Sequence, residues 1–162
     1  MTANAIMAGC PQTELIEIEL ADSVAIISLN RPDKRNAIND AMRADLIQAL
    51  DWADRSAEIR AIVLTGRGKG FCAGGDIAAM RERLSAPAGR VGINGWQRQR
   101  RTHHLLTMLH DIPKPTIAAV NGAAAGLGCD LALCCDFVIS ARDATFVVSY
   151  VLRGLIPDGG GM

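Results

Sequence analysis

Two short apolar segments, each followed by a glycine-rich stretch, constrain the fold of this chain most strongly. Residues 59–66 (IRAIVLTG) and 114–122 (KPTIAAVNG) are apolar almost throughout. Apolar runs of this length, bounded by turn residues, are typical of buried strands. The stretches that follow, residues 66–76 and 121–128, are rich in glycine and alanine and lead into segments with a helical pattern. The sequence therefore predicts a scaffold in which two buried strands present two flexible loops.

The remaining segments place these strands in an α/β fold. Residues 13–20 and 24–30 flank a short turn and predict a hairpin. Residues 40–55 predict a helix capped by Asp40. Further along the chain we expect helices at 76–84, 96–110 and 123–133, strands at 136–141 and 144–148, and a mobile loop at 85–95. Strands and helices alternate at the spacing of ββα units, which is typical of an α/β fold.

Length and charge limit the number of domains and the class of partner. The chain has 162 residues, which predicts one domain: a flexible tail at 1–12 and a core at 13–162. Lys and Arg number 17, and Asp and Glu also number 17, so the formal net charge is zero. This balance argues against nucleic acid and membrane surfaces as partners. With no secretory signal pattern at the N-terminus, we expect a cytoplasmic protein.

The cysteine and histidine residues do not form a metal-ligand pattern. Five cysteines are present, an odd number with no CxxC pair, so we expect reduced and mostly buried thiols. His103, His104 and His110 have no carboxylate or thiol at ligand spacing, and we expect them on the solvated face of a helix. We therefore predict no metal site.

The two glycine-rich loops, Phe71–Asp76 and Asn121–Gly128, are the candidate functional site. Small residues let a backbone approach a ligand closely, and the start of a helix leaves N–H donors without partners. If the loops are adjacent, each could donate one N–H to the same oxygen, which is the geometry of an oxyanion hole. A structural reading stays open, in which the glycines only permit tight packing of helix on sheet. Neither loop matches a phosphate-binding loop.

Four segments in order resemble the signatures of the crotonase superfamily, which includes enoyl-CoA hydratases and isomerases. They are LNRPDKRNAI, LTGRGKGFCAGGDI, KPTIAAVNGAAAGLGCDLALCCD and GLIPDGG. The resemblance covers almost the whole chain and implies the spiral of ββα units that this superfamily shares with ClpP. It also implies an acyl-CoA thioester as substrate, with no cofactor because coenzyme A is part of that substrate.

The resemblance assigns roles to residues of both loops. The N–H groups of Gly75 and Leu127 match the two donors that hold the thioester enolate. Lys34 and Arg35 match contacts to the nucleotide part of coenzyme A, although they could equally be solvated surface charges. Further positions that match the lining of the substrate pocket are Ala37, Ala73, Asp76, Ile77 and Gly126.

The carboxylates decide which reaction to expect. Hydratases of the family use two glutamates, and this chain has Asp130 at the first position and Tyr150 at the second. Tyrosine is a poor base at neutral pH, with an ordinary pKa near 10. Asp158 stands where several isomerases of the family carry their single catalytic acid. We expect Asp158 to be the general base, and Asp130 to be either a base or an orienting group. The structural alternatives are that Asp158 is only a turn residue and that Asp130 is only an acid in the first turn of a helix.

Family members continue beyond the position that matches Met162, through a helical region that completes the pocket and builds trimers or dimers of trimers. The resemblance therefore leads us to expect a chain that lacks this C-terminal region. Isomerisation or hydration of an enoyl-CoA is the first expected activity. A thioester hydrolase, or a silent acyl-CoA-binding or oligomerisation fragment, is the alternative.

Overall fold

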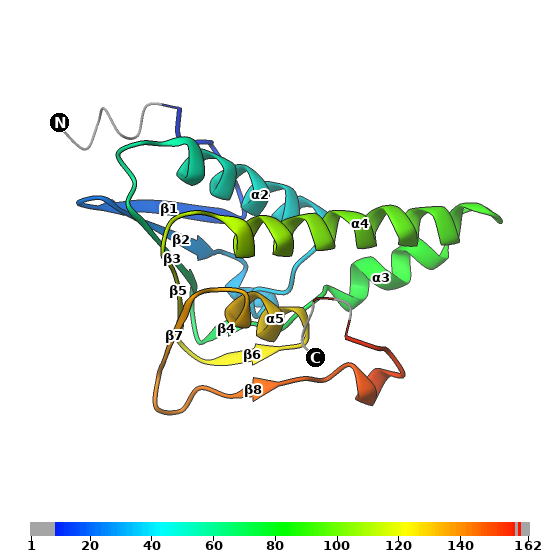
Figure 1. Ribbon diagram of the computed structural model, residues 1–162. Coiled ribbons are helices and arrows are strands. Elements are labelled where there is room, and N and C mark those ends of the chain that lie inside the picture. Colours follow the sequence, from blue (N-terminus) through cyan, green and yellow to red (C-terminus); the bar gives the residue numbers. More distant parts are fainter. Residues whose placement is uncertain (1–8, 158, 160–162) are drawn as a thin grey trace.

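A computed structural model describes residues 9–157 and 159 of the chain, and it begins with the predicted hairpin (Figure 1). Strands β1 (Ile16–Ala21) and β2 (Val24–Leu29) pair antiparallel, with Ile16 opposite Leu29. Alternation places Ala25, Ile27 and Leu29 of β2 in the core. The hairpin that the sequence predicts is confirmed.

Three successive pairs of strands then build two sheets. The first strand of each pair joins the hairpin in a five-stranded sheet, and these strands are β3 (Ala61–Gly66), β5 (Thr116–Val120) and β7 (Phe137–Ser140). The second strands form a small sheet, and they are β4 (Gly70–Cys72), β6 (Ala123–Ala125) and β8 (Phe146–Val147). All pairings among these six strands are parallel. Each unit thus adds one strand to each sheet, which confirms the predicted spiral of repeating units.

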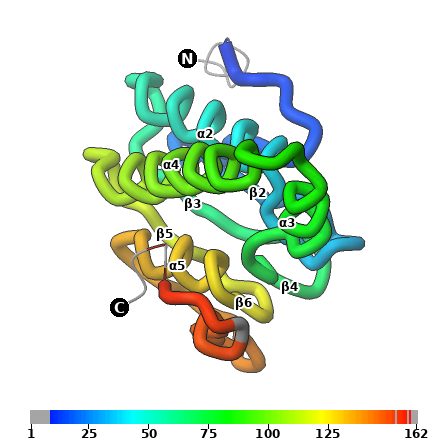
Figure 2. The backbone as a smooth tube through the Cα atoms, turned by 90° about the vertical axis from the view of Figure 1, so that its right-hand side faces the viewer, coloured from blue at the N-terminus to red at the C-terminus, as the bar shows by residue number. Residues whose placement is uncertain are grey.

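In the described part of the chain, helices pack on and between the sheets (Figures 1 and 2). They are α2 (Asp40–Arg55), α3 (Ile77–Leu84), α4 (Arg90–Asp111) and α5 (Leu127–Leu133). Short 3-10 turns occur at η1 (Pro32–Lys34) and η2 (Val151–Arg153). Helix α2 packs on the hairpin and beside α4, and α5 contacts α4 and strands of both sheets. The core between them is aliphatic, with Leu46, Leu64 and Leu105 buried completely or almost so.

Three predicted boundaries are wrong, each for a local reason. The helix cap is Asn39 and not Asp40, because the Asn39 side chain accepts from the Met42 N–H at 2.8 Å. The predicted helix at 123–133 begins as strand β6, since pairing with β4 and β8 overrides the helical preference of alanine. The predicted loop at 85–95 is helical from Arg90, where α4 begins after the left-handed Gly89.

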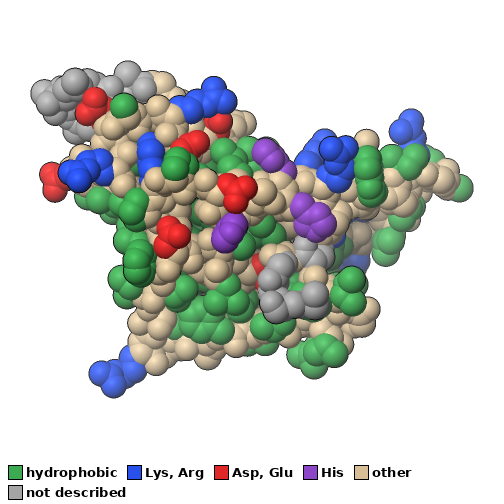
Figure 3. Space-filling model, in the orientation of Figure 1, with side chains coloured by type: hydrophobic (Ala, Val, Ile, Leu, Met, Phe, Trp, Pro, Cys, Tyr) green, Lys and Arg blue, Asp and Glu red, His purple; other side chains and the backbone are tan. Residues whose placement is uncertain are grey.

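Apolar side chains are exposed over the last repeats of the fold. Phe137, Ile139, Phe146 and Val148 are each more than 40% exposed, and Figure 3 shows hydrophobic side chains gathered in the lower part of the molecule, where the later strands lie. None of the five cysteines forms a disulfide; Cys72, Cys129 and Cys135 are buried, and Cys10 and Cys134 are half-buried. Within the described part of the chain, no helix combines the length and apolar character needed to cross a membrane.

Candidate active site

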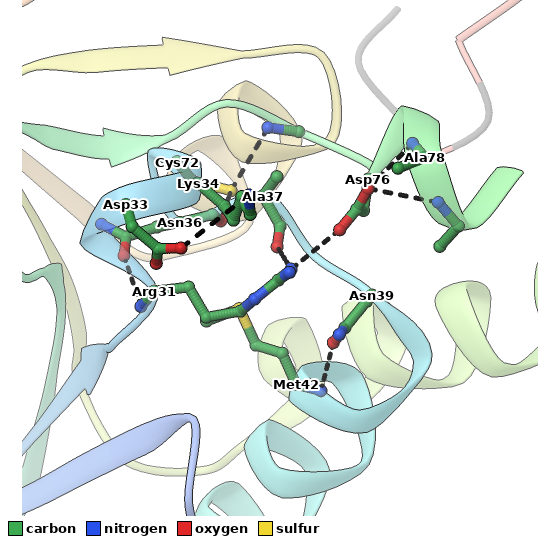
Figure 4. Close-up of polar contacts among 12 residues, drawn as sticks. Arg31, Asp33, Lys34, Asn36, Ala37, Asn39, Met42, Cys72, Asp76 and Ala78 are labelled. Atoms are coloured by element: carbon green, nitrogen blue, oxygen red, sulfur yellow. Dashed lines mark hydrogen bonds and ion pairs between the residues drawn. The ribbon is translucent and has the colours of Figure 1, made fainter.

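The first glycine-rich loop, residues 72–76, is held at its end by Asp76. Its carboxylate caps α3 by accepting from the N–H groups of Ala78 at 2.9 Å and Ala79 at 3.2 Å. The other oxygen pairs with the Arg31 guanidinium at 3.0 Å (Figure 4). Partial burial raises the pKa of the Asp76 carboxyl, but the N–H donors and Arg31 outweigh it and hold that pKa below its usual value. Asp76 therefore anchors the loop as an anion.

A buried asparagine joins the segment before α2 to the same loop. The Asn36 side-chain nitrogen lies near three carbonyl oxygens, those of Arg67 (2.9 Å), Gly70 (2.9 Å) and Phe71 (3.1 Å). Its side-chain oxygen accepts from the Arg31 N–H at 2.9 Å. Sequence reasoning missed Asn36, because nothing in a polar loop distinguishes the one asparagine that becomes completely buried. This residue fixes the position of Lys34, Arg35 and the turn that carries them.

Lys34, Arg35 and Ala37 lie beside the first loop. The Arg35 carbonyl accepts from the Ala73 N–H at 2.9 Å, and the side chains of Lys34 and Arg35 are exposed. The Lys34 ammonium lies 4.0 Å from the carboxylate of the exposed Asp33 (Figure 4). The Ala37 carbonyl accepts from Arg31. These residues are therefore next to the loop, with two cationic side chains in solvent.

The Gly75 N–H points away from the segment that holds the loop. Ile38 donates to the Gly74 carbonyl at 2.7 Å, and its own carbonyl accepts from the Asp76 N–H at 2.9 Å. Successive N–H groups of an extended chain point to opposite sides. The Gly75 N–H is therefore directed away from Ile38, and Gly75 lines a cavity.

The two glycine-rich loops lie side by side, as expected. Gly74 has φ +91°, and a methyl group there would lie 2.6 Å from the Ala125 carbonyl oxygen and 3.4 Å from the Leu127 nitrogen. Leu127 is the first residue of α5, so its N–H has no carbonyl one turn earlier to bind. Gly75 and Leu127, which come from two different repeats of the fold, thus line one cavity.

That cavity has a volume of about 490 Å³ and lies between the loops and α4. It is lined by Ala73, Gly74, Gly75, Ile77, Met80, Arg98, Gln99, Gly126, Leu127, Ser149, Tyr150, Leu155 and Ile156. Five of the predicted site residues are among them: Ala73, Gly75, Ile77, Gly126 and Leu127. Lys34, Arg35, Ala37 and Asp76 lie outside this lining. Asp158 lies outside the described residues.

Sequence reasoning did not identify the side chains that close the cavity. Met80 comes from α3, Arg98 and Gln99 come from α4, and Leu155 and Ile156 follow η2. Their patterns are those of ordinary amphipathic helices and loops. These residues line the site only because the path of the backbone places α4 over the loops.

Asp130 and Tyr150 form a buried pair beside the second loop. Asp130 lies on α5 with 1% of its surface exposed, and the Tyr150 hydroxyl donates to its carboxylate. Tyr150 is 8% exposed and lines the cavity. Among the described residues, His, Cys, Asp and Glu side chains form no group that could hold a metal ion. The polar side chains that line the cavity are those of Arg98, Gln99, Ser149 and Tyr150.

Comparison with known proteins identifies a family with the same fold. The family described as enoyl-CoA hydratase/isomerase matches residues 19–162. A 1,2-epoxyphenylacetyl-CoA isomerase of Escherichia coli is 43% identical over 148 residues, which are 91% of this chain and 55% of that protein. A probable enoyl-CoA hydratase of Rhodobacter capsulatus is 42% identical over 147 residues, 90% of this chain and 53% of that protein.

Solved structures give the same result. An enoyl-CoA hydratase from a Polaromonas species superposes with a TM-score of 0.82 at 42% identity, covering 90% of this chain and 55% of that one. An enoyl-CoA hydratase from Shewanella pealeana superposes with a TM-score of 0.85 at 32% identity, covering 98% of this chain and 58% of that one. The chain thus spans little more than half the length of the relatives it matches.

Proposed function

The chain belongs to the enoyl-CoA hydratase/isomerase family, and from its site we propose that it binds an acyl-CoA thioester and stabilises the enolate of that thioester. The observation that supports this proposal is that Gly75 and Leu127 line one cavity, where their backbone N–H groups would be the two donors. Two such donors, fixed in place before the reaction, stabilise a developing oxyanion. One donor typically contributes roughly 2.7–4 kcal/mol to the transition state.

We favour isomerisation of an enoyl-CoA double bond over hydration. Hydration requires one group to activate water and another to deliver a proton, and Tyr150 occupies the position of the family's second glutamate. One carboxylate is enough for isomerisation, because it removes a proton from one carbon and returns it to another. We propose Asp158 as that base, with Asp130 as the alternative. The relative in Escherichia coli is itself named an isomerase.

Hydration is the second candidate, because several relatives are named hydratases. In that reaction Asp130 would be one of the two proton-transfer groups. The two candidates share the enolate and differ only in whether water is added. Their products therefore distinguish them directly.

Lys34 and Arg35 are proposed to contact the phosphates of coenzyme A. Both are exposed cations on a turn whose backbone is bonded to the first loop. Removing either charge should raise KM and leave kcat almost unchanged, since these residues are remote from the reacting carbons. A fall in kcat alone would contradict this role.

The first experiment is α-proton exchange of butyryl-CoA in deuterium oxide, followed by mass spectrometry. Gly75→Pro deletes one N–H donor and should lower exchange by roughly 10²–10³-fold. Gly75→Ala is the matched control, since it retains the N–H and loses less. Equal exchange rates in the two variants would refute the oxyanion assignment.

A second experiment assigns the base and the reaction. Asp158→Asn should slow migration of the double bond of a 3-enoyl-CoA by roughly 10²–10⁴-fold if Asp158 transfers the proton. Unchanged turnover removes Asp158 from the mechanism and leaves Asp130. Release of free coenzyme A thiol, with no isomerised product, would indicate a thioester hydrolase instead.

A further inference from the structure

Tyr150 connects the cavity lining to the buried Asp130 carboxylate. Tyr150 lines the cavity together with Gly126 and Leu127 of the second loop, and it donates a hydrogen bond to Asp130. A methyl group built on Gly126 would lie 4.0 Å from the Tyr150 Cζ atom, which carries the hydroxyl. The phenol is therefore close to the Leu127 N–H, where the thioester oxygen is proposed to bind.

Asp130 lies behind Tyr150 and not on the cavity wall. It is 1% exposed, and among the described residues the cavity lining includes Tyr150 and omits Asp130. On another side the buried Gly159 packs so closely on the Asp130 carboxylate that a side chain at 159 would overlap it. The hydrogen bond from Tyr150 therefore links Asp130 to the cavity lining.

We propose that Tyr150 is a catalytic residue that relays a proton between the acyl group and Asp130; this inference rests on the proposed enolate chemistry and takes up the alternative in which Asp130, and not Asp158, is the base. The Tyr150 oxygen takes the α-proton of the thioester as the hydroxyl proton passes to the Asp130 carboxylate. The electron pair of the broken C–H bond becomes the enolate, whose oxygen is held by Gly75 and Leu127. Tyr150 is a neutral phenol before and after the step, and Asp130 has gained one proton.

The coupling of Tyr150 to Asp130 explains how a tyrosine could accept a proton at neutral pH. A tyrosine that acted alone would have to begin as a phenolate, which is scarce at neutral pH because the ordinary pKa is near 10. Coupled to a carboxylate, the phenol gives up one proton while it accepts another, so no phenolate forms. Hydrogen-bonded networks of this kind are strengthened in a low-dielectric interior. To complete isomerisation, Asp130 and Tyr150 return the proton by the reverse transfer to a second carbon of the acyl group.

Three variants test the relay by α-proton exchange of butyryl-CoA. Tyr150→Phe removes the hydroxyl and keeps the ring, and Asp130→Asn removes the carboxylate. Each should lower exchange by roughly 10²–10⁴-fold, with KM changed far less. The double variant should be no slower than the slower single variant, because both residues act in one step. Exchange in Tyr150→Phe within about threefold of the parent chain, or losses that multiply in the double variant, would overturn the relay.

A second readout does not depend on turnover. Tyr150 is the one tyrosine of the sequence, so tyrosine isotope-labelled at Cζ gives a single assigned NMR signal. The relay predicts that this signal shifts on saturation with butyryl-CoA and shifts again in Asp130→Asn. A signal that ignores bound butyryl-CoA overturns the relay alone. Absence of butyryl-CoA binding by calorimetry overturns the proposed function, and the relay with it.

Discussion

Replacing Gly74 with alanine should destabilise the chain far more than the same change one residue later. Gly74 has φ +91°, a backbone conformation that side chains disfavour. Its new methyl group would lie 2.6 Å from the Ala125 carbonyl oxygen, which belongs to β6 and cannot rotate away. Gly75 is not in that backbone region, and its methyl would meet only the terminal carbon of Met80.

The magnitude follows from two penalties and one gain. A left-handed backbone costs an L-residue about 1–2 kcal/mol, and overpacking costs about 1–3 kcal/mol. Alanine restricts the unfolded chain more than glycine does and returns about 0.4–1 kcal/mol. Gly74→Ala should therefore lower the free energy of unfolding by about 1–5 kcal/mol. In a domain of this size each kcal/mol lowers Tm by roughly 2–4 °C.

Thermal and urea unfolding of both variants, followed by circular dichroism, measures the difference. Gly75→Ala should cost less than about 1 kcal/mol, because the flexible Met80 side chain can move aside. The reasoning fails if the two variants unfold at the same urea concentration. Such a result would mean that the two loops are not in backbone contact at Gly74, and the shared oxyanion site would lose its geometric basis.

Three further results are expected. Asn36→Ala leaves buried carbonyl groups without a donor. The free energy of unfolding, measured by urea unfolding, should therefore fall by about 2–4 kcal/mol. A loss below about 1 kcal/mol contradicts the role of Asn36. The pKa of Asp76 is lowered by folding, so its stabilisation is present above the unfolded pKa near 4 and is lost as pH falls through the folded value. The parent chain should lose stability on acidification below about pH 4 more steeply than Asp76→Asn, and parallel pH profiles would exclude this linkage. Burial raises the pKa of the Cys72 thiol to about 12, so iodoacetamide at neutral pH should label it only after unfolding, as peptide mass spectrometry would show.

The parts of the fold that the sequence predicts are those with local causes. The apolar runs that become β3 and β5 are visible because they are short, almost wholly apolar and bounded by turn residues, although in the structure their residues alternate between buried and half-buried. The helix at Asp40–Arg55 is visible because its apolar residues recur at helical spacing. The two loops are visible because glycine is concentrated there. In each case the signal lies within about a dozen residues.

The parts that escaped prediction have causes distant in sequence. Strand β6 is three alanines, and only its pairing with β4 and β8 makes it a strand. Asn36 is buried by carbonyl groups more than 30 residues away. Likewise, Tyr150 and Asp130 are 20 residues apart, and their hydrogen bond depends on the return of the chain past α5. The intrinsic preference of a residue for helix or strand carries no information on contacts between residues so far apart in the sequence.

The proposed site follows from the repeat itself. Strands β4 and β6 pair in parallel, so the segments that leave their carboxyl ends emerge at the same edge of the small sheet. Those segments are the two glycine-rich loops, and each ends at the start of a helix. The donors are backbone N–H groups, so the side chain at position 127 is free to be leucine without loss of the donor. Residue identity at Leu127 should therefore affect which acyl group fits the cavity, while the ability to hold an enolate depends on the pairing of the strands.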